Sequence, residues 1–172
     1  MLANSARTLL PQIKAAYDNK DKAAFAQLTG EWLRRMQLQD DLLKTNSYFL
    51  LGRWLSYVPE WSSSPAELDR LNYDARSILT TWGNRKASED GNLHEYGNKD
   101  WAGLTRDYYM ARWKMYFDSL STSLDSGQPP QSIDWYALGD KWNHETRSYS
   151  PTPEGSAYDA ATAIAQELKL AP

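Results

Sequence analysis

The chain has 172 residues, of which 41% are hydrophobic and 24% charged, and its net charge is −3. This length and composition suit one domain with a sizeable core and exclude a disordered chain. The absence of a basic excess removes the electrostatic argument for a nucleic-acid partner. A mean hydropathy of −0.71, with no apolar run of about 18 residues, excludes a membrane span. The chain has no cysteine, but 13% of its residues are aromatic.

Apolar residues recur at helical spacing through most of the chain, and no segment shows the alternation of a strand. The expected helices cover about residues 2–19, 21–44, 47–58, 65–82, 98–123, 133–142 and 155–168. We therefore predict an all-α fold. It is a single irregular bundle of about six to seven helices, spanning residues 1–172 as one domain. Its long central helix, residues 98–123, would extend about 39 Å.

Three local features refine this prediction. Pro11 is expected to kink the first helix, and Gly30 costs its helix about 1 kcal/mol relative to alanine, which indicates a packing reason or a break there. Ser64 and Glu67 form a capping-box pattern at a helix start. The polar segment 83–92 is predicted to be a loop, long for a bundle connection and therefore functional or mobile.

Catalytic patterns are scarce. His94 and His144 are each followed by Glu, but neither has the second His that a zinc helix needs four residues on, so we expect no metal and no cofactor. Asp40 and Asp41 point about 100° apart on a helix and cannot act as a glycosidase carboxylate pair. We expect no catalytic residue in this chain.

Two aromatic residues lie off the helical stripes, beside the predicted loop. Trp82 precedes it and Tyr96 follows it. An indole or phenol ring can pack on the C–H face of a sugar while its N–H or O–H binds a hydroxyl, but it can equally anchor a loop. The spacing alone leaves both roles open.

Near this loop the chain resembles a known family. The segments that carry the resemblance are 49–55 (FLLGRWL), 79–83 (LTTWG), 92–104 (NLHEYGNKDWAGL) and 108–113 (YYMARW). Together and in this order they resemble the C-terminal helical domain of family 89 glycoside hydrolases, the α-N-acetylglucosaminidases. The similarity is greatest from residue 40 to residue 120 and weak after residue 129.

The resemblance implies a retaining enzyme that removes terminal α-linked N-acetylglucosamine without a metal. Its two catalytic glutamates belong to an upstream (β/α)8 barrel that is missing from this chain, which is therefore expected to be inactive alone. The helical domain would pack on that barrel and line the sugar pocket with Trp82, Leu93 and Tyr96. The expected partners are the barrel of the parent enzyme and a glycan ending in N-acetylglucosamine, with no nucleic acid and no membrane. An extracellular, periplasmic or lysosomal location follows from the family.

Other hypotheses stay open beside this one. The chain begins inside a predicted helix, which fits a piece of a longer enzyme, and its barrel-facing surface could support self-association. Alternatively, it is a stand-alone helical module that binds carbohydrate or peptide through the aromatic loop 82–98, or a scaffold whose aromatic residues are all core.

Overall fold

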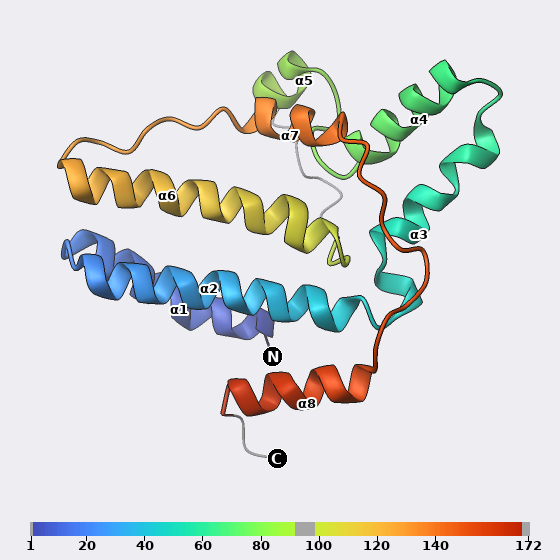
Figure 1. The fold of residues 1–172 in the computed structure, drawn as a ribbon. Coiled ribbons are helices and arrows are strands. Elements are labelled where there is room, and N and C mark those ends of the chain that lie inside the picture. The colour runs from blue at the N-terminus through green and yellow to red at the C-terminus, as the bar shows by residue number, and fades with distance from the viewer. Residues whose placement is uncertain (1, 92–98, 170–172) are drawn as a thin grey trace.

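The structure, a computed structural model, describes residues 2–91 and 99–169 and consists of helices packed in an irregular bundle (Figure 1). Within these residues there is no strand beyond one parallel bridge between Leu50 and Ala102, so the all-α prediction is confirmed. The α-helices are α1 (Leu2–Asp18), α2 (Lys22–Leu43), α3 (Leu51–Ser56), α4 (Pro65–Ser77), α5 (Arg85–Asp90), α6 (Met110–Ser126), α7 (Trp135–Asn143) and α8 (Ala157–Glu167). Shorter turns are the 3-10 helices η1 (Ser47–Phe49) and η2 (Val58–Trp61) and the π-helical turn η3 (Thr105–Tyr109).

Side-chain caps explain where several of these helices begin. Asp21, Ser64, Asp134 and Ser156 each precede a helix and accept a hydrogen bond from a backbone N–H in its first turn. At the other end of α6, Gly127 adopts a left-handed φ of 68° that stops the helix. Polar residues at the helix ends thus fix the boundaries within the bundle.

The expected long helix 98–123 differs from the structure. The regular α-helix in this segment, α6, starts only at Met110, directly after the π turn η3. Helix α2, with 22 residues, is the longest α-helix in the described part of the chain. The cause is Asp40 of α2, whose carboxylate accepts hydrogen bonds from the backbone N–H groups of Gly103, at 2.7 Å, and Arg106, at 3.1 Å. This cap from a distant helix fixes the start of the helical segment at residue 104.

Two further boundaries also differ. The loop predicted for residues 83–92 contains the short helix α5, because Asn84 caps it and Arg85 pairs with Glu89 one turn later. The helix expected to reach Trp82 ends at Ser77, where α4 gives way to turns. Helix α5 is the element that the sequence prediction lacked.

Neither Pro11 nor Gly30 interrupts its helix. Helix α1 continues through Pro11, and α2 continues through Gly30. A Cβ added at Gly30 would meet no atom within 4 Å, so the expected packing reason is wrong as well. The glycine lies on an exposed side of α2 and costs helix stability without any contact in return.

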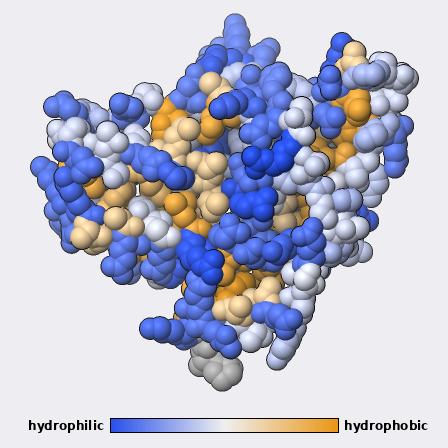
Figure 2. Space-filling view, viewed as in Figure 1, coloured by the Kyte–Doolittle hydropathy of each residue, from blue (hydrophilic) through white to orange (hydrophobic). Residues whose placement is uncertain are grey.

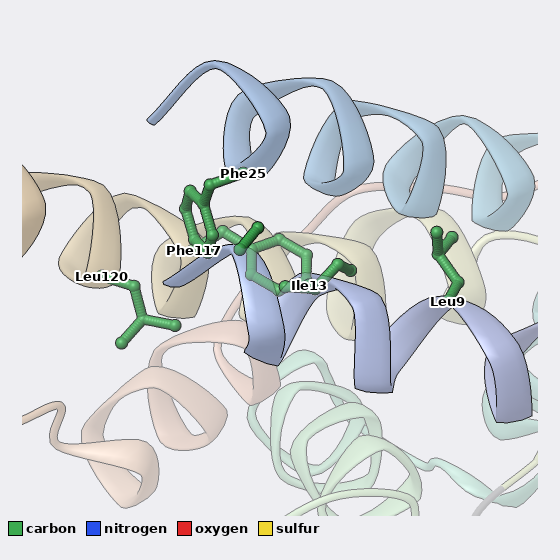
Figure 3. Close-up of a cluster of buried hydrophobic side chains, with 6 residues drawn as sticks. Leu9, Ile13, Phe25, Phe117 and Leu120 are labelled. Atoms are coloured by element: carbon green, nitrogen blue, oxygen red, sulfur yellow. The ribbon is translucent and has the colours of Figure 1, made fainter. Parts of the chain in front are cut away.

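The first core lies between α1, α2 and α6, which run side by side (Figure 1). Its buried members, most of them labelled in Figure 3, are Leu9, Ile13, Ala16, Phe25, Phe117 and Leu120. The Phe25 and Phe117 rings meet edge to face, with centroids 6.3 Å apart. This core follows directly from the apolar stripes of three helices.

The second core joins the remaining elements. It consists of Leu51, Leu79, Leu104, Tyr108 and Trp142, which come from α3, the turn after α4, the start of the α6 segment and α7. The extended segment 144–156 crosses over it: the ring of Tyr149 packs on Gly103, and the carbonyl of Ser150 lies where a Cβ on Gly52 would stand. Close backbone approach at these glycines brings the short elements together.

The face of the molecule shown in Figure 2 is mostly hydrophilic. On the face in Figure 2, apolar side chains gather in separate patches, one of them over the region of α6 and the start of α7. Among the described residues no helix is both long and apolar enough to cross a membrane.

Candidate functional site

The candidate site is the turn that follows α4, residues 78–82. Trp82, at the end of this turn, has a φ of +60°, and its side chain is 45% exposed. A left-handed φ is rare for a bulky side chain and costs about 1–2 kcal/mol. Backbone strain of this kind persists only where neighbouring contacts enforce it, and it concentrates at functional sites. The turn therefore presents an indole in a conformation that the surroundings must hold.

A buried polar network holds the turn against α7. Thr80 and Thr81 are almost fully buried, and both hydroxyls contact the amide of Asn143. Thr80 Oγ1 donates to Asn143 Oδ1 at 2.6 Å, and Asn143 Nδ2 donates to Thr81 Oγ1 at 3.1 Å. Because the Asn143 side chain is itself 98% buried, these bonds are shielded from water and fix the turn.

Glycine permits α7 to approach this turn. A Cβ placed on Gly139 would lie 2.8 Å from Thr81 Cγ2 and 3.3 Å from Tyr108 Oη, both closer than carbon normally packs. Tyr73 strengthens the same contact between α4 and α7, since its hydroxyl donates to Asp140 Oδ1 at 2.8 Å. Burial, together with this carboxylate, raises the pKa of Tyr73 to about 12.

Helix α5 holds the other side of the turn. Ser88 is buried and its hydroxyl donates to the Thr81 carbonyl oxygen at 3.1 Å. Arg85 forms two hydrogen bonds to Asp134, at 3.0 and 2.9 Å, and its guanidinium lies 4.7 Å from the centre of the Tyr136 ring. The hydrogen bonds from Arg85 lower the pKa of Asp134. The residues before and after Trp82 are therefore clamped between α5 and α7.

The three residues predicted to line a sugar pocket are not all placed. Trp82 lies on the exposed turn, whereas Leu93 and Tyr96 fall outside the described residues. His94 also falls outside them, and His144 lies at the end of α7, where its ring packs against Tyr73. No grouping of three or more His, Asp or Glu that could hold a metal occurs in the described part of the chain.

Sequence reasoning missed a second feature, a cleft of about 660 Å³ between α2, η3, α6 and α7. Its lining residues are Met36, Gln39, Asp100, Thr105, Tyr109, Arg112, Trp113, Tyr116 and Trp135. The aromatic members on α6 recur at helical spacing, which is also typical of a buried core stripe. The signal that could have found the cleft is the second row of aromatic residues on that helix, which one buried stripe does not need.

Comparisons with known proteins show the family of this chain. Residues 1–167 match the family model described as Alpha-N-acetylglucosaminidase (NAGLU) C-terminal domain. The chain is 30% identical over 158 residues to the human protein named Alpha-N-acetylglucosaminidase, covering 89% of this chain and 21% of the human one.

Solved structures of a family 89 glycoside hydrolase from Clostridium perfringens are also similar. One holds its substrate GlcNAc-alpha-1,4-galactose, with a TM-score of 0.89, and another holds 2-acetamido-1,2-dideoxynojirmycin, with a TM-score of 0.90. Both are 32% identical and cover 97% of this chain but 20% of theirs. The chain thus spans about a fifth of the length of these relatives. The family match and the shared fold confirm the resemblance, and the chain belongs to the C-terminal domain family of the family 89 α-N-acetylglucosaminidases.

Proposed function

We propose that this chain forms one wall of the pocket in which a retaining α-N-acetylglucosaminidase holds a terminal α-linked N-acetylglucosamine. Trp82, Leu93 and Tyr96 would line that wall, and a (β/α)8 barrel of the same parent enzyme would supply the rest of it. The observation that carries the proposal is the exposed Trp82 indole on a strained, clamped turn. An exposed indole kept rigid at a cost in strain is suited to contact a ligand rather than to support the fold.

In this role the chain binds and orients the sugar but does not perform the chemistry. The Trp82 ring would cover a face of the sugar or its N-acetyl group, and the Tyr96 O–H would bind a hydroxyl. The acid/base and nucleophile are two glutamates that the proposal places on the barrel. A wall fixed by Asn143 and Ser88 would reduce the cost of ordering the pocket when substrate binds.

Exposed apolar side chains beside Trp82 support packing on a barrel. Ile78 is 47% exposed one turn before Trp82. Trp54 of α3 adjoins the same part of α4, because its indole Nε1 donates to the Ala75 carbonyl oxygen at 2.9 Å. Large aromatic residues at the surface are typical of interfaces, and an uncovered face of this kind also favours self-association. Light scattering over a range of concentrations measures the latter.

The proposal is tested in a hybrid enzyme. This chain replaces the matching segment of the C. perfringens enzyme, which the shared fold allows. We expect the hybrid to hydrolyse an aryl α-N-acetylglucosaminide and Trp82→Ala to lower kcat/KM by about tenfold or more. Tyr158→Ala, an exposed aromatic change on α8, is the matched control and should have no effect. An active hybrid that is indifferent to Trp82→Ala contradicts the proposal.

The purified chain provides a second test. We expect it to be inactive on the same substrate, and hydrolysis at enzyme-like rates would refute the non-catalytic role. Calorimetry with glycans ending in N-acetylglucosamine distinguishes the stand-alone module. Affinity in the isolated chain that disappears in Trp82→Ala would favour that module over the pocket wall, because a wall alone lacks half of the contacts.

A further inference from the structure

The cleft between α2, η3, α6 and α7 has the size and composition of a ligand site separate from the Trp82 turn. Its volume of about 660 Å³ lies in the range of small-molecule sites, about 300–1,000 Å³. Rings from η3, α6 and α7 form its walls, and polar side chains from α2, from the segment before η3, from η3 and from α6 line it. Trp82 is not among the residues that line it.

The aromatic walls are arranged to offer ring faces and edges. Tyr116 of α6 and Trp135 of α7 are the more exposed rings, at 42% and 36%. Trp113 stands behind them, packed on Trp32 of α2 with ring centroids 4.7 Å apart, which keeps α6 fixed relative to α2. The Arg112 guanidinium lies 4.8 Å from the centre of the Trp135 ring and so holds the indole in place.

One polar group in the wall of the cleft is buried and unpaired among the described residues. Thr105 is 97% buried, and its hydroxyl has no hydrogen-bond partner among the described residues. A buried hydroxyl without a partner costs about 1–3 kcal/mol, and each such group in a native structure calls for an explanation. Thr105 also begins the π-helical turn η3, a distortion that occurs frequently at functional sites.

The remaining polar groups indicate what the ligand is. At the rim, Gln39 Nε2 donates to Asp100 Oδ1 at 3.1 Å, which leaves further acceptor and donor capacity on both side chains. Asp100 and Arg112 carry opposite charges, so the cleft favours neither an anion nor a cation. A neutral ring with an apolar C–H face and hydroxyl groups at its edge matches this mixture of rings and hydrogen-bonding groups.

We propose that this cleft binds a neutral pyranose residue of a glycan, at a site distinct from the wall around Trp82. The sugar packs a C–H face on Tyr116 and Trp135, and Thr105 Oγ1, which has no exposed surface in this structure, pairs with a hydroxyl only when the wall shifts to uncover it. Gln39 and Asp100 receive the hydroxyls at the rim. The inference rests on the proposed function only in its choice of a glycan, since the geometry of the cleft is independent of the Trp82 turn.

The test is a titration of the purified chain with galactose, with N-acetylglucosamine and with GlcNAc-α-1,4-galactose. Binding is monitored through the NMR chemical shifts of backbone and indole N–H groups. We expect saturable shifts at residues of the cleft with at least one of these saccharides. Tighter binding of the disaccharide would assign the cleft to a glycan chain, and equal binding would assign it to single sugars. Absence of saturable binding to all three overturns the proposal.

Variants then locate the binding site. Tyr116→Ala and Trp135→Ala should each weaken binding about tenfold, through loss of a stacking ring. Thr105→Val, which keeps the volume and removes the hydroxyl, should weaken it about fivefold without loss of fold. Trp61→Ala, on η2 and 78% exposed, is the matched control and should bind normally.

Trp82→Ala separates this inference from the proposed function. If the saccharide binds in the cleft, its affinity for the Trp82→Ala variant should be unchanged. Binding that is lost in Trp82→Ala but kept in the three cleft variants overturns the cleft and instead supports the module at loop 82–98. If the chain binds none of the saccharides, the proposal that the cleft binds a sugar is wrong. The pocket-wall proposal is then still tested separately, by the activity of the hybrid enzyme.

Discussion

The α1–α2–α6 layer and the region around the Trp82 turn are held together by different means. The layer has long helices and a core of six buried apolar residues that meet through regular stripes. The turn region has short helices, a buried Asn143–Thr80–Thr81 network and glycines at close approaches. The layer is stabilised by apolar contacts spread over three helices, whereas the turn depends on a few hydrogen bonds and close approaches. Functional geometry is usually found in regions of the second kind.

The largest effects should come from fully buried rings, of which Phe25 belongs to the layer. Phe25→Ala removes a ring that is 2% exposed and packs on Phe117, and we expect the free energy of unfolding to fall by about 4 kcal/mol. Denaturation in guanidinium chloride measures it. Phe49→Ala, on η1 and 42% exposed, is the matched control, and a loss as large as that of Phe25→Ala would show that the effect does not depend on burial of the ring.

Gly139→Ala examines the turn region. The added methyl would lie 2.8 Å from Thr81 Cγ2, and the network around Asn143 prevents Thr81 from moving away. We expect a loss of about 2–3 kcal/mol in unfolding free energy, with altered NMR signals at Thr80, Thr81 and Trp82. A neutral result would mean that the turn is free to shift and is not a rigid wall.

Asp40 connects the two regions, because it lies on α2 and caps the start of the α6 segment. Asp40→Ala leaves the N–H groups of Gly103 and Arg106 without their acceptor and should cost about 2 kcal/mol. Asp40→Asn keeps an acceptor oxygen and should cost less. Burial raises the pKa of Asp40, although both N–H groups oppose this shift.

The raised pKa fixes the sign of a pH effect. The folded protein holds the Asp40 proton more tightly than the unfolded chain does. The stability that this tighter proton binding at Asp40 contributes is therefore fully present below the ordinary carboxyl pKa. It is lost as the pH rises through the raised pKa of Asp40 in the folded protein. Wild type should lose stability relative to Asp40→Asn over this window, as denaturation at several pH values will measure. The opposite slope would contradict the burial argument.

The sequence predicted the layer better than the turn region. The stripes of α1 and α2, and the Ser64 cap of α4, depend on neighbours within a few residues and were placed correctly. The late start of the α6 segment depends on Asp40, 63 residues from Gly103, and no local pattern reports such a cap. Helix α5 was missed because charged residues between two turn formers resemble a loop.

The candidate site divides in the same way. The exposure of Trp82 agrees with its position off the helical stripes, but its left-handed φ and its clamp arise only in the folded chain. The cleft escaped prediction because its residues come from helices that are distant in sequence and because Trp113 and Tyr116 fit a core stripe. Roles that need a neighbour from another element cannot be obtained from periodicity.

Gly30→Ala makes the same chemical change as Gly139→Ala, but we expect it to raise the free energy of unfolding rather than lower it. Nothing lies within 4 Å of the added methyl, and alanine is the better helix former. We expect a gain of about 0.5–1 kcal/mol in the free energy of unfolding. A loss of unfolding free energy would mean that this side of α2 makes a contact that is absent from the described residues.

Trp82→Ala should have the smallest effect on stability, below about 0.5 kcal/mol, because the indole is nearly half exposed. Trp142→Ala, a buried control on α7 that is 3% exposed, should cost about 4 kcal/mol under the same conditions. Trp82→Gly adds a test of the backbone: glycine is normally less stable than alanine, but at a φ of +60° it should be at least as stable. A loss above about 3 kcal/mol in Trp82→Ala would make this indole part of the core and would remove the basis for the pocket wall.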